Sequence, residues 1–219
     1  MIELAVFDWN GTILADTQAL MNAGNLVIQT YGGTPLSRRD YSKKFYFPAI
    51  DFFCEQGCDR EALERSAAYL DLLHSVYESQ AVKCRTRKGA RKVLQCLKEN
   101  SVDSVILSNH MKEAIETQLK RLGLESYFSE ILANTDYSAT QKGNNKINRL
   151  RYYLERRGQD PAKACIVGDA PEDIEIGKRF NMRTVAITDG YYSTDRLRAS
   201  NPDARISRLD RLIEIFTSV

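Results

Sequence analysis

The sequence predicts an α/β fold, a doubly wound parallel sheet with an inserted helical segment. Over residues 84–219, short apolar stretches with strand character alternate with helical stretches. Such alternation is typical of right-handed crossovers that build a parallel sheet with helices on both faces. The first strand, residues 3–7, is separated from the others by residues 15–83, which contain no evident strand. This connection is too long for an ordinary crossover, so we expect a separate helical subdomain there.

The inserted segment carries two clear helical patterns. Asp16 or Thr17 can cap a helix that Gly32 and Gly33 end, since glycine is common just after a helix. A second, amphipathic helix is expected over residues 59–80, where apolar side chains recur at steps of three and four residues. These side chains are Leu63, Ala67, Leu70, Leu73 and Tyr77.

The rest of the chain forms the expected core, residues 1–14 together with residues 84–219. Glycines end two of its helices, at Gly123 and Gly158. The expected helices are residues 88–99, 112–122, 147–157, 173–180 and 208–216. The expected strands after the insert are residues 103–107, 130–133, 164–167 and 183–187.

The composition excludes several classes of function. Of 219 residues 43% are hydrophobic, and Lys+Arg 31 against Asp+Glu 29 leaves a net charge of only +2. No basic run supports nucleic-acid binding, and no apolar run approaches the roughly 18 residues that cross a membrane. The start of the chain lacks a signal-peptide pattern, and five scattered cysteines suit reduced thiols. We therefore expect a cytoplasmic protein, a monomer or a homodimer, with no nucleic-acid or membrane partner.

Polar side chains directly follow three of the expected strands. Asp8, the pair Ser108 and Asn109, and Asp169 all occupy such positions, and Asp173 lies in the first turn of the next helix. Because the carboxyl ends of parallel strands lie along one edge of a sheet, these groups can converge there. Two carboxylates on adjacent strand ends repel each other unless a cation lies between them. Oxygen ligands favour a hard divalent cation, and the sequence therefore predicts a Mg²⁺ site.

At these positions the chain resembles the haloacid dehalogenase superfamily of phosphatases and related hydrolases. The first family motif is similar to residues 8–12, with one departure at Asn10. The second is similar to residues 108–109, the third to Lys146 at the start of a helix, and the fourth to residues 168–173. The motifs occur in the family's order, and the insert fits the helical cap of a phosphoglycolate-phosphatase-like subgroup.

The resemblance implies a reaction and a metal site. Asp8 would be the nucleophile that forms an aspartyl-phosphate with a small phosphorylated metabolite. Mg²⁺ would be held by Asp8, by the backbone carbonyl of Asn10 and by Asp169. Asp173 would either bind the ion directly or contact its ligands.

The resemblance also implies a set of phosphate-binding residues. Ser108, together with backbone N–H groups near Gly11 and Asn109, would hold phosphate oxygens. Thr12 and His110 complete the expected substrate-binding set. His110 could line the pocket or only cap the next helix.

Two catalytic positions leave alternatives open. Lys146 would pair with the phosphoryl group and screen Asp8, with Lys142 as the other candidate for the motif lysine. Asn10 stands where phosphatases of the family carry an aspartate that protonates the leaving oxygen and then activates water. An amide can do neither, and such help is typically worth ~10²–10⁴ in rate. Three explanations of Asn10 stay open. The substrate's leaving group needs no proton, or the protein is a weak or inactive member of the family that binds a phosphorylated ligand or a protein partner. Alternatively, Asn10 is an engineered replacement of the aspartate.

Basic residues of the insert are candidates for substrate recognition. Arg38, Arg39, Lys43 and Lys44 cluster before an aromatic run. They either form a solvated face, or one of them meets a second anionic group of the substrate. We therefore expect a Mg²⁺-dependent phosphatase whose substrate is chosen by the insert.

Overall fold

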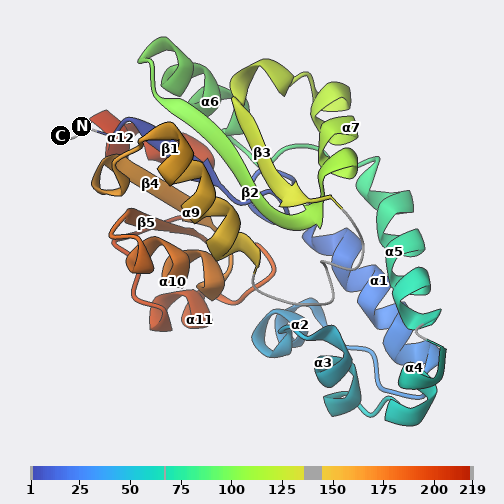
Figure 1. Cartoon of the computed structure of the whole chain (residues 1–219). Helices are drawn as coiled ribbons and strands as arrows, with labels where there is room; N and C mark the ends of the chain where they lie inside the picture. Colours follow the sequence, from blue (N-terminus) through green and yellow to red (C-terminus); the bar gives the residue numbers. More distant parts are fainter. Residues whose placement is uncertain (1, 67, 136–144, 218–219) are drawn as a thin grey trace.

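The computed structural model describes residues 2–66, 68–135 and 145–217. Within them lies a six-stranded sheet in the order β3-β2-β1-β4-β5-β6, and all of its pairings are parallel (Figure 1). This confirms the doubly wound parallel α/β fold that the alternating pattern predicts. The strands are β1 (Leu4–Phe7), β2 (Asp103–Met111), β3 (Glu130–Asn134), β4 (Ala164–Gly168), β5 (Arg183–Ile187) and β6 (Ala204–Ile206).

The end of the central strand β1 lies at the edge of the sheet where the candidate site residues follow the strands. Phe7 pairs with Ile106 of β2 on one side and with Val167 of β4 on the other. The next residue, Asp8, still donates its N–H to the carbonyl of Val167 at 2.9 Å. Since β1 and β4 end at nearly the same level, the residues that follow them meet at one edge of the sheet, as expected for parallel strands.

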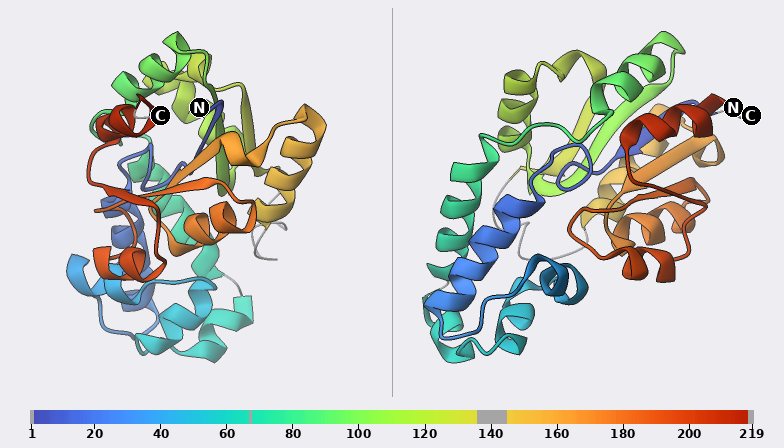
Figure 2. Two further views of the ribbon diagram at one scale, coloured as in Figure 1. Left: turned by 90° about the vertical axis from the view of Figure 1, so that its left-hand side faces the viewer. Right: turned by 180° about the vertical axis from the view of Figure 1, so that it is seen from behind.

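Helices cover both faces of the sheet (Figures 1 and 2). Alternate residues of β1 supply the two buried layers, with Ala5 and Phe7 on one face and Leu4 and Val6 on the other. The first face packs on α6 (Ala90–Glu99), α7 (Lys112–Leu122) and α12 (Leu212–Thr217), and the second on α9 (Asn145–Arg157) and α10 (Pro171–Arg179). A short helix, α11 (Thr194–Ala199), buries Leu197 against α10 and β5.

In the expected insert, residues 15–83, every regular element that the structure describes is a helix, as the sequence predicts. Its longer helices α1 and α5 lie side by side, and the shorter ones gather at their far end (Figures 1 and 2). An aromatic-rich cluster, which includes Phe45, Phe52 and Phe53, fills the space among the short helices. The helices are α1 (Thr17–Thr30), α2 (Arg38–Lys44), α3 (Ala49–Glu55), α4 (Arg60–Ser66) and α5 (Ala68–Ala81).

The helical segment contacts the rest of the chain at both of its ends. Its two connections run together, and the N–H of Ala15 donates to the carbonyl of Arg85 at 2.9 Å. At the other end, the loop after β5 contacts α2, where Ser193 N–H donates to the carbonyl of Ser42 at 3.0 Å. The ring of Tyr191 in that loop joins the aromatic cluster of the insert.

The structure adds elements that the sequence pattern does not indicate. β6 has three residues, too few to show an alternation, and α11 has six. β2 runs on to Met111, so residues 108–109 lie inside its extended end instead of just after it. None of the helices in the described part of the chain combines the length and apolarity that a bilayer crossing requires.

Candidate active site

Asp8 lies at the carboxyl end of β1 with both of its carboxyl oxygens in contact with other side chains. Lys146 Nζ, from the first turn of α9, lies 2.8 Å from Asp8 Oδ1. The hydroxyl of Thr12 lies 3.2 Å from Asp8 Oδ2 and 3.1 Å from Asp169 Oδ1. The Asp8 carboxyl is therefore held in one orientation at the edge of the sheet.

Two further carboxyl groups complete a buried acidic cluster. Ligand atoms of Asp8, Asp169 and Asp173 all lie within 4.8 Å of one another. All three residues are at most 7% exposed, and Lys146 is 3% exposed. Lys146 Nζ also contacts Asp173 Oδ1 at 2.8 Å, so one ammonium lies between two of the carboxyl groups. The structure thus brings together the acids expected to converge at this edge.

The charges of the cluster do not balance. Burial raises the pKa of Asp8 well above its usual value, and Lys146 opposes that rise. Burial likewise raises the pKa of Asp169 to about 7, against the effect of a hydrogen bond from the N–H of Tyr191. Although burial disfavours its charged form, Asp173 and Asp8 raise the pKa of Lys146 well above the ordinary value. The cluster therefore has three carboxyl groups to one ammonium, and without a cation burial favours protons on Asp8 and Asp169; a bound cation would take the place of those protons.

The end of β2 places a hydroxyl beside Asn10, two residues after Asp8. Ser108 is buried, and its Oγ lies 3.4 Å from Asn10 Oδ1 and accepts the N–H of His110 at 3.1 Å. Asn109 is exposed and donates through Nδ2 to Glu172 Oε2 at 3.2 Å. His110 turns toward the insert, where its Nε2 lies 3.1 Å from Glu78 Oε1. The structure therefore favours a place for His110 at the insert over a helix cap.

Asn10 belongs to a hydrogen-bond network that the sequence did not indicate. Its Nδ2 donates to Asp16 Oδ2 at 2.8 Å and to the hydroxyl of Tyr77, from α5, at 2.6 Å. Asp16 also accepts bonds from the hydroxyls of Tyr77 and Tyr191, at 2.5 and 2.7 Å. With both amide protons so used, Asn10 Oδ1 is the atom that faces Ser108.

This network corrects two expectations about the turn after β1. Asp16 stands at the N-cap of α1, but its side chain caps no N–H of that helix. Its Oδ1 instead accepts the N–H of Gly11 at 2.7 Å, so that N–H is not directed at a phosphate. Gly11 has φ +72, and a Cβ there would lie 2.3 Å from Asp169 Oδ2. Gly11 therefore provides room for Asp169 more than a donor for the ligand.

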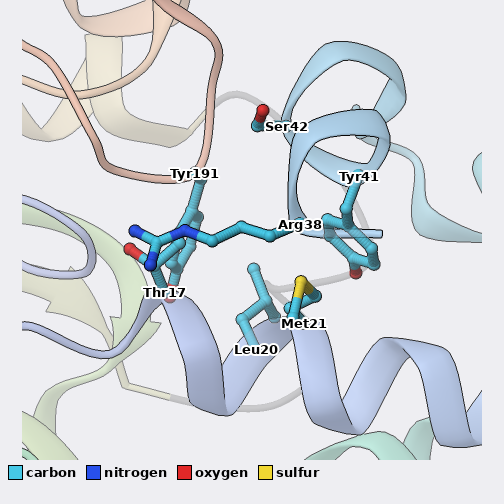
Figure 3. A pocket seen from close by; sticks show the side chains of 7 residues that line it. All are labelled: Thr17, Leu20, Met21, Arg38, Tyr41, Ser42 and Tyr191. Atoms are coloured by element: carbon cyan, nitrogen blue, oxygen red, sulfur yellow. The ribbon is translucent and has the colours of Figure 1, made fainter. Parts of the chain in front are cut away.

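The four basic residues of the insert do not share one site: Arg38 and Arg39 line a cavity, whereas Lys43 and Lys44 do not. Arg38 extends from α2 toward Thr17 and Tyr191, as Figure 3 shows for a narrow pocket between α1, α2 and the loop after β5. A neighbouring cavity of about 370 Å³ is lined by Arg38 and Arg39 together with Asp189. Gly190, in the same lining, is like Gly11 a residue whose Cβ would lie too close to Asp169 Oδ2, here at 2.1 Å. Lys43 and Lys44 line neither space.

Comparison with known proteins gives the family. The haloacid dehalogenase-like hydrolase family matches residues 5–187. The chain belongs to this family. A phosphoglycolate phosphatase of Synechococcus elongatus is 25% identical over 100% of this chain and 99% of that protein. The pyrophosphatase PpaX of Halalkalibacterium halodurans is 22% identical over 98% of this chain and 96% of that protein. The crystal structure of a predicted phosphatase from Clostridium acetobutylicum covers 100% of both chains with a TM-score of 0.81 and 17% identity.

The resemblance stated from the motifs is thus confirmed, and the chain is a haloacid dehalogenase-like hydrolase. Lys146 occupies the position next to the acids, and Lys142, the other candidate, lies outside the described residues. Sequence reasoning missed Asp16 as a site residue, and it assigned Tyr77 only to an apolar helix face. The one available signal was an acid, Asp16, directly after the three apolar residues 13–15.

The raised pKa of Asp169 predicts how the stability of this hydrolase changes with pH in the absence of metal. The folded protein holds a proton on Asp169 up to about pH 7, whereas an unfolded aspartate releases it near 3.8. Folding therefore takes up a proton between these values, and the free energy of unfolding falls as the pH rises through this window. Urea unfolding in a metal chelator from pH 4 to pH 7.5 measures this slope.

Asp169→Asn provides the control, because an amide does not titrate. Its free energy of unfolding should depend less steeply on pH over the same window. Equal slopes in the two proteins would show that Asp169 does not hold the proton.

Proposed function

We propose that this hydrolase is a Mg²⁺-dependent phosphatase that acts on a small phosphorylated metabolite through an aspartyl-phosphate on Asp8. The observation that supports this most is the setting of the Asp8 carboxyl. It is buried, held by the Lys146 ammonium at 2.8 Å, and within metal-sharing distance of Asp169 and Asp173. A nucleophilic carboxylate beside a metal site and a fixed cation is suited to phosphoryl transfer.

The residues present fit a hard divalent cation. Carboxylate and carbonyl oxygens are the ligands that Mg²⁺ takes, and the cluster has three carboxyl groups to a single ammonium, that of Lys146. Asp8, Asp169 and the backbone carbonyl of Asn10 would hold the ion. When bound, Mg²⁺ would neutralise phosphate charge and align the attack.

The reaction then divides into two displacements at phosphorus. First, a carboxylate oxygen of Asp8 attacks the phosphorus, and the bond from phosphorus to the leaving oxygen breaks. The Ser108 hydroxyl and the Lys146 ammonium bind the transferring phosphoryl oxygens. In the second step, water attacks the phosphorus of the aspartyl-phosphate and the bond to the Asp8 oxygen breaks. Both protons of the water stay on the phosphate, which leaves as dihydrogen phosphate, and the Asp8 carboxylate is restored.

Asn10 restricts the leaving groups that suit this site. Its Oδ1 can accept a hydrogen bond but cannot give or take a proton, and its Nδ2 is engaged by Asp16 and Tyr77. Leaving groups that depart as stable anions, such as phosphate from an anhydride, a carboxylate or a phenolate, need no proton. We infer that the substrate is a phosphoanhydride, acyl phosphate or aryl phosphate, which agrees with the similarity to a pyrophosphatase.

The helical segment, residues 15–83, would act as a cap that selects the substrate. It reaches the site through Tyr77, which contacts Asn10, and through Glu78, which contacts His110. The cavity beside Arg38 and Arg39 offers positive charge to a second anionic group of a substrate.

Asn10 also supports a second candidate function, in which the protein is a non-catalytic member of the family that binds a phosphorylated ligand. Turnover of p-nitrophenyl phosphate with and without Mg²⁺ separates the two. Mg²⁺-dependent release of phosphate supports the enzyme, and binding of phosphate without any turnover supports the binding protein.

Asp8→Asn should abolish turnover while the protein stays folded, because the amide is not a nucleophile toward phosphorus. Asp71→Asn, a change at an exposed acid of α5, should leave the rate unchanged. Phosphate release and thermal unfolding measure the two properties. Near-normal turnover in a folded Asp8→Asn protein contradicts a covalent mechanism.

Asp169→Ala should weaken Mg²⁺ binding more than Asp173→Ala. The partners of Asp169 are neutral donors, the Thr12 hydroxyl and the Tyr191 N–H, so its charge is available to a cation. Asp173 is already paired with Lys146, and loss of such an outer partner typically costs ~10–100-fold in metal affinity.

Calorimetric titration of Mg²⁺ into the two variants ranks these losses. Glu175→Ala, at an exposed position of α10, serves as the control. Equal or reversed losses would show that Asp173 contacts the ion directly.

Asn10→Asp should accelerate hydrolysis of alkyl phosphates by ~10²–10⁴, the usual worth of a positioned acid and base. The gain at the phosphorylation step should be smaller for aryl phosphates, whose leaving groups need no acid. An aspartate here would face Asp16 Oδ2, which lies 2.8 Å from Asn10 Nδ2, so the variant should also unfold more easily.

Burst kinetics separate the phosphorylation step from the dephosphorylation step that all substrates share. Asn10 precedes Gly11, and intact mass analysis must show that no deamidated protein contributes to the wild-type rate. If verified Asn10 protein hydrolyses alkyl phosphates as fast as the variant, another group supplies the proton.

A further inference from the structure

The end of β2 that carries Ser108 is not held by the sheet. Leu107 pairs with Leu132 of β3, and the next pair is Met111 with Asn134, so three residues of β2 lie opposite one residue of β3. On the other side, the pairing with β1 stops at Ile106. A bulge of this kind leaves backbone groups without their ladder partners, and these groups need other partners to stay in place.

Arg149 supplies those partners. It follows Lys146 by one helical turn on α9, so the two side chains leave the same face of that helix. Its Nη2 donates to the backbone carbonyl of Ser108 at 2.8 Å and to Asn109 Oδ1 at 3.2 Å. The guanidinium thus holds two consecutive residues of the bulge from one planar group.

A second contact extends this hold to the next carbonyl. Arg149 Nη1 donates to Asn134 Oδ1, and Asn134 Nδ2 donates to the carbonyl of Asn109 at 2.6 Å. Asn134 is only 3% exposed, and its amide is oriented by the guanidinium because its oxygen must face a donor. Side chains therefore replace the missing ladder bonds at both Ser108 and Asn109.

The helix that carries Arg149 is itself fixed in place. Leu150, Tyr153 and Leu154 of α9 are buried against the sheet. The backbone that carries Arg149 is accordingly held in place. The planar guanidinium also presents its N–H donors in a fixed geometry that a lysine ammonium lacks.

We propose that Arg149 is the positioning residue of the phosphate site, because it fixes the bulged end of β2 so that the Ser108 hydroxyl lies beside Asn10, where it can bind the phosphate. This inference rests on the proposed phosphatase function. Arg149 lies outside the four motifs. Helix α9 would then have two roles, because its Lys146 contacts the nucleophile and its Arg149 positions Ser108.

The test measures binding of inorganic phosphate by calorimetry, with Mg²⁺ present, and the KM and kcat for p-nitrophenyl phosphate. Arg149→Ala should weaken phosphate binding by at least about tenfold, the scale of losing a hydrogen bond from a charged donor. In a Ser108→Ala background the same change should cost less than about threefold, because the group that Arg149 positions is gone. Arg151→Ala, an exposed arginine of the same helix, should change neither value.

Arg149→Lys separates position from charge. The variant keeps a positive charge but lacks the fork, so most of the loss should remain. Full recovery with lysine overturns the proposal in favour of simple charge attraction, and equal losses with and without Ser108 overturn it as well. A lower melting temperature with unchanged phosphate affinity shows a role in stability alone. A wild-type protein that neither binds phosphate nor turns over overturns the proposed function together with this inference.

Discussion

Lys146 Nζ lies 2.8 Å from oxygens of both Asp8 and Asp173, in a part of the protein that excludes water. With Asp169 beside them, one ammonium faces more than one carboxylate, and burial makes the remaining repulsion costly. The cluster can relieve it by keeping protons or by binding a cation. Only the second response leaves Asp8 as a carboxylate that can act as a nucleophile. A cation beside it would also offset the charge of a phosphate ester, which otherwise repels an attacking anion.

The sheet alone does not build this site. Parallel strand ends place Asp8 and Asp169 at one edge, but the residues that must approach them closely are fixed by other means. A Cβ at Gly168 would lie 2.1 Å from Asp173 Oδ2, and the glycines at 11 and 190 make similar room for Asp169. Ser108 depends on side chains of α9 and β3 because its strand leaves the ladder. The order of the strands thus determines which edge of the sheet carries the site, and local packing determines how closely its side chains approach one another.

This division explains what could be predicted from the sequence. The convergence of Asp8 and Asp169 follows from strand order, which an alternating pattern makes visible. The bond between Asp16 and Tyr77 joins residues 61 apart, and nothing in a helical repeat distinguishes that tyrosine from its apolar neighbours. Arg149 likewise has the appearance of a solvated helix residue until the bulge of β2 is seen. Contacts that substitute for regular secondary structure leave no periodic signal.

Asn10 joins the chemistry of the site to the helical segment. Its amide donates to Asp16 and to Tyr77 of α5, so the donors of the side chain face the insert and its acceptor faces Ser108. A carboxylate at this position could not donate to Asp16, and it would place a second acid against one that already accepts bonds from Gly11 and Tyr191. The amide therefore gives up proton transfer and gains a fixed contact between core and insert. That exchange would suit the proposed phosphatase, whose leaving groups would need no proton and whose substrate the insert would select.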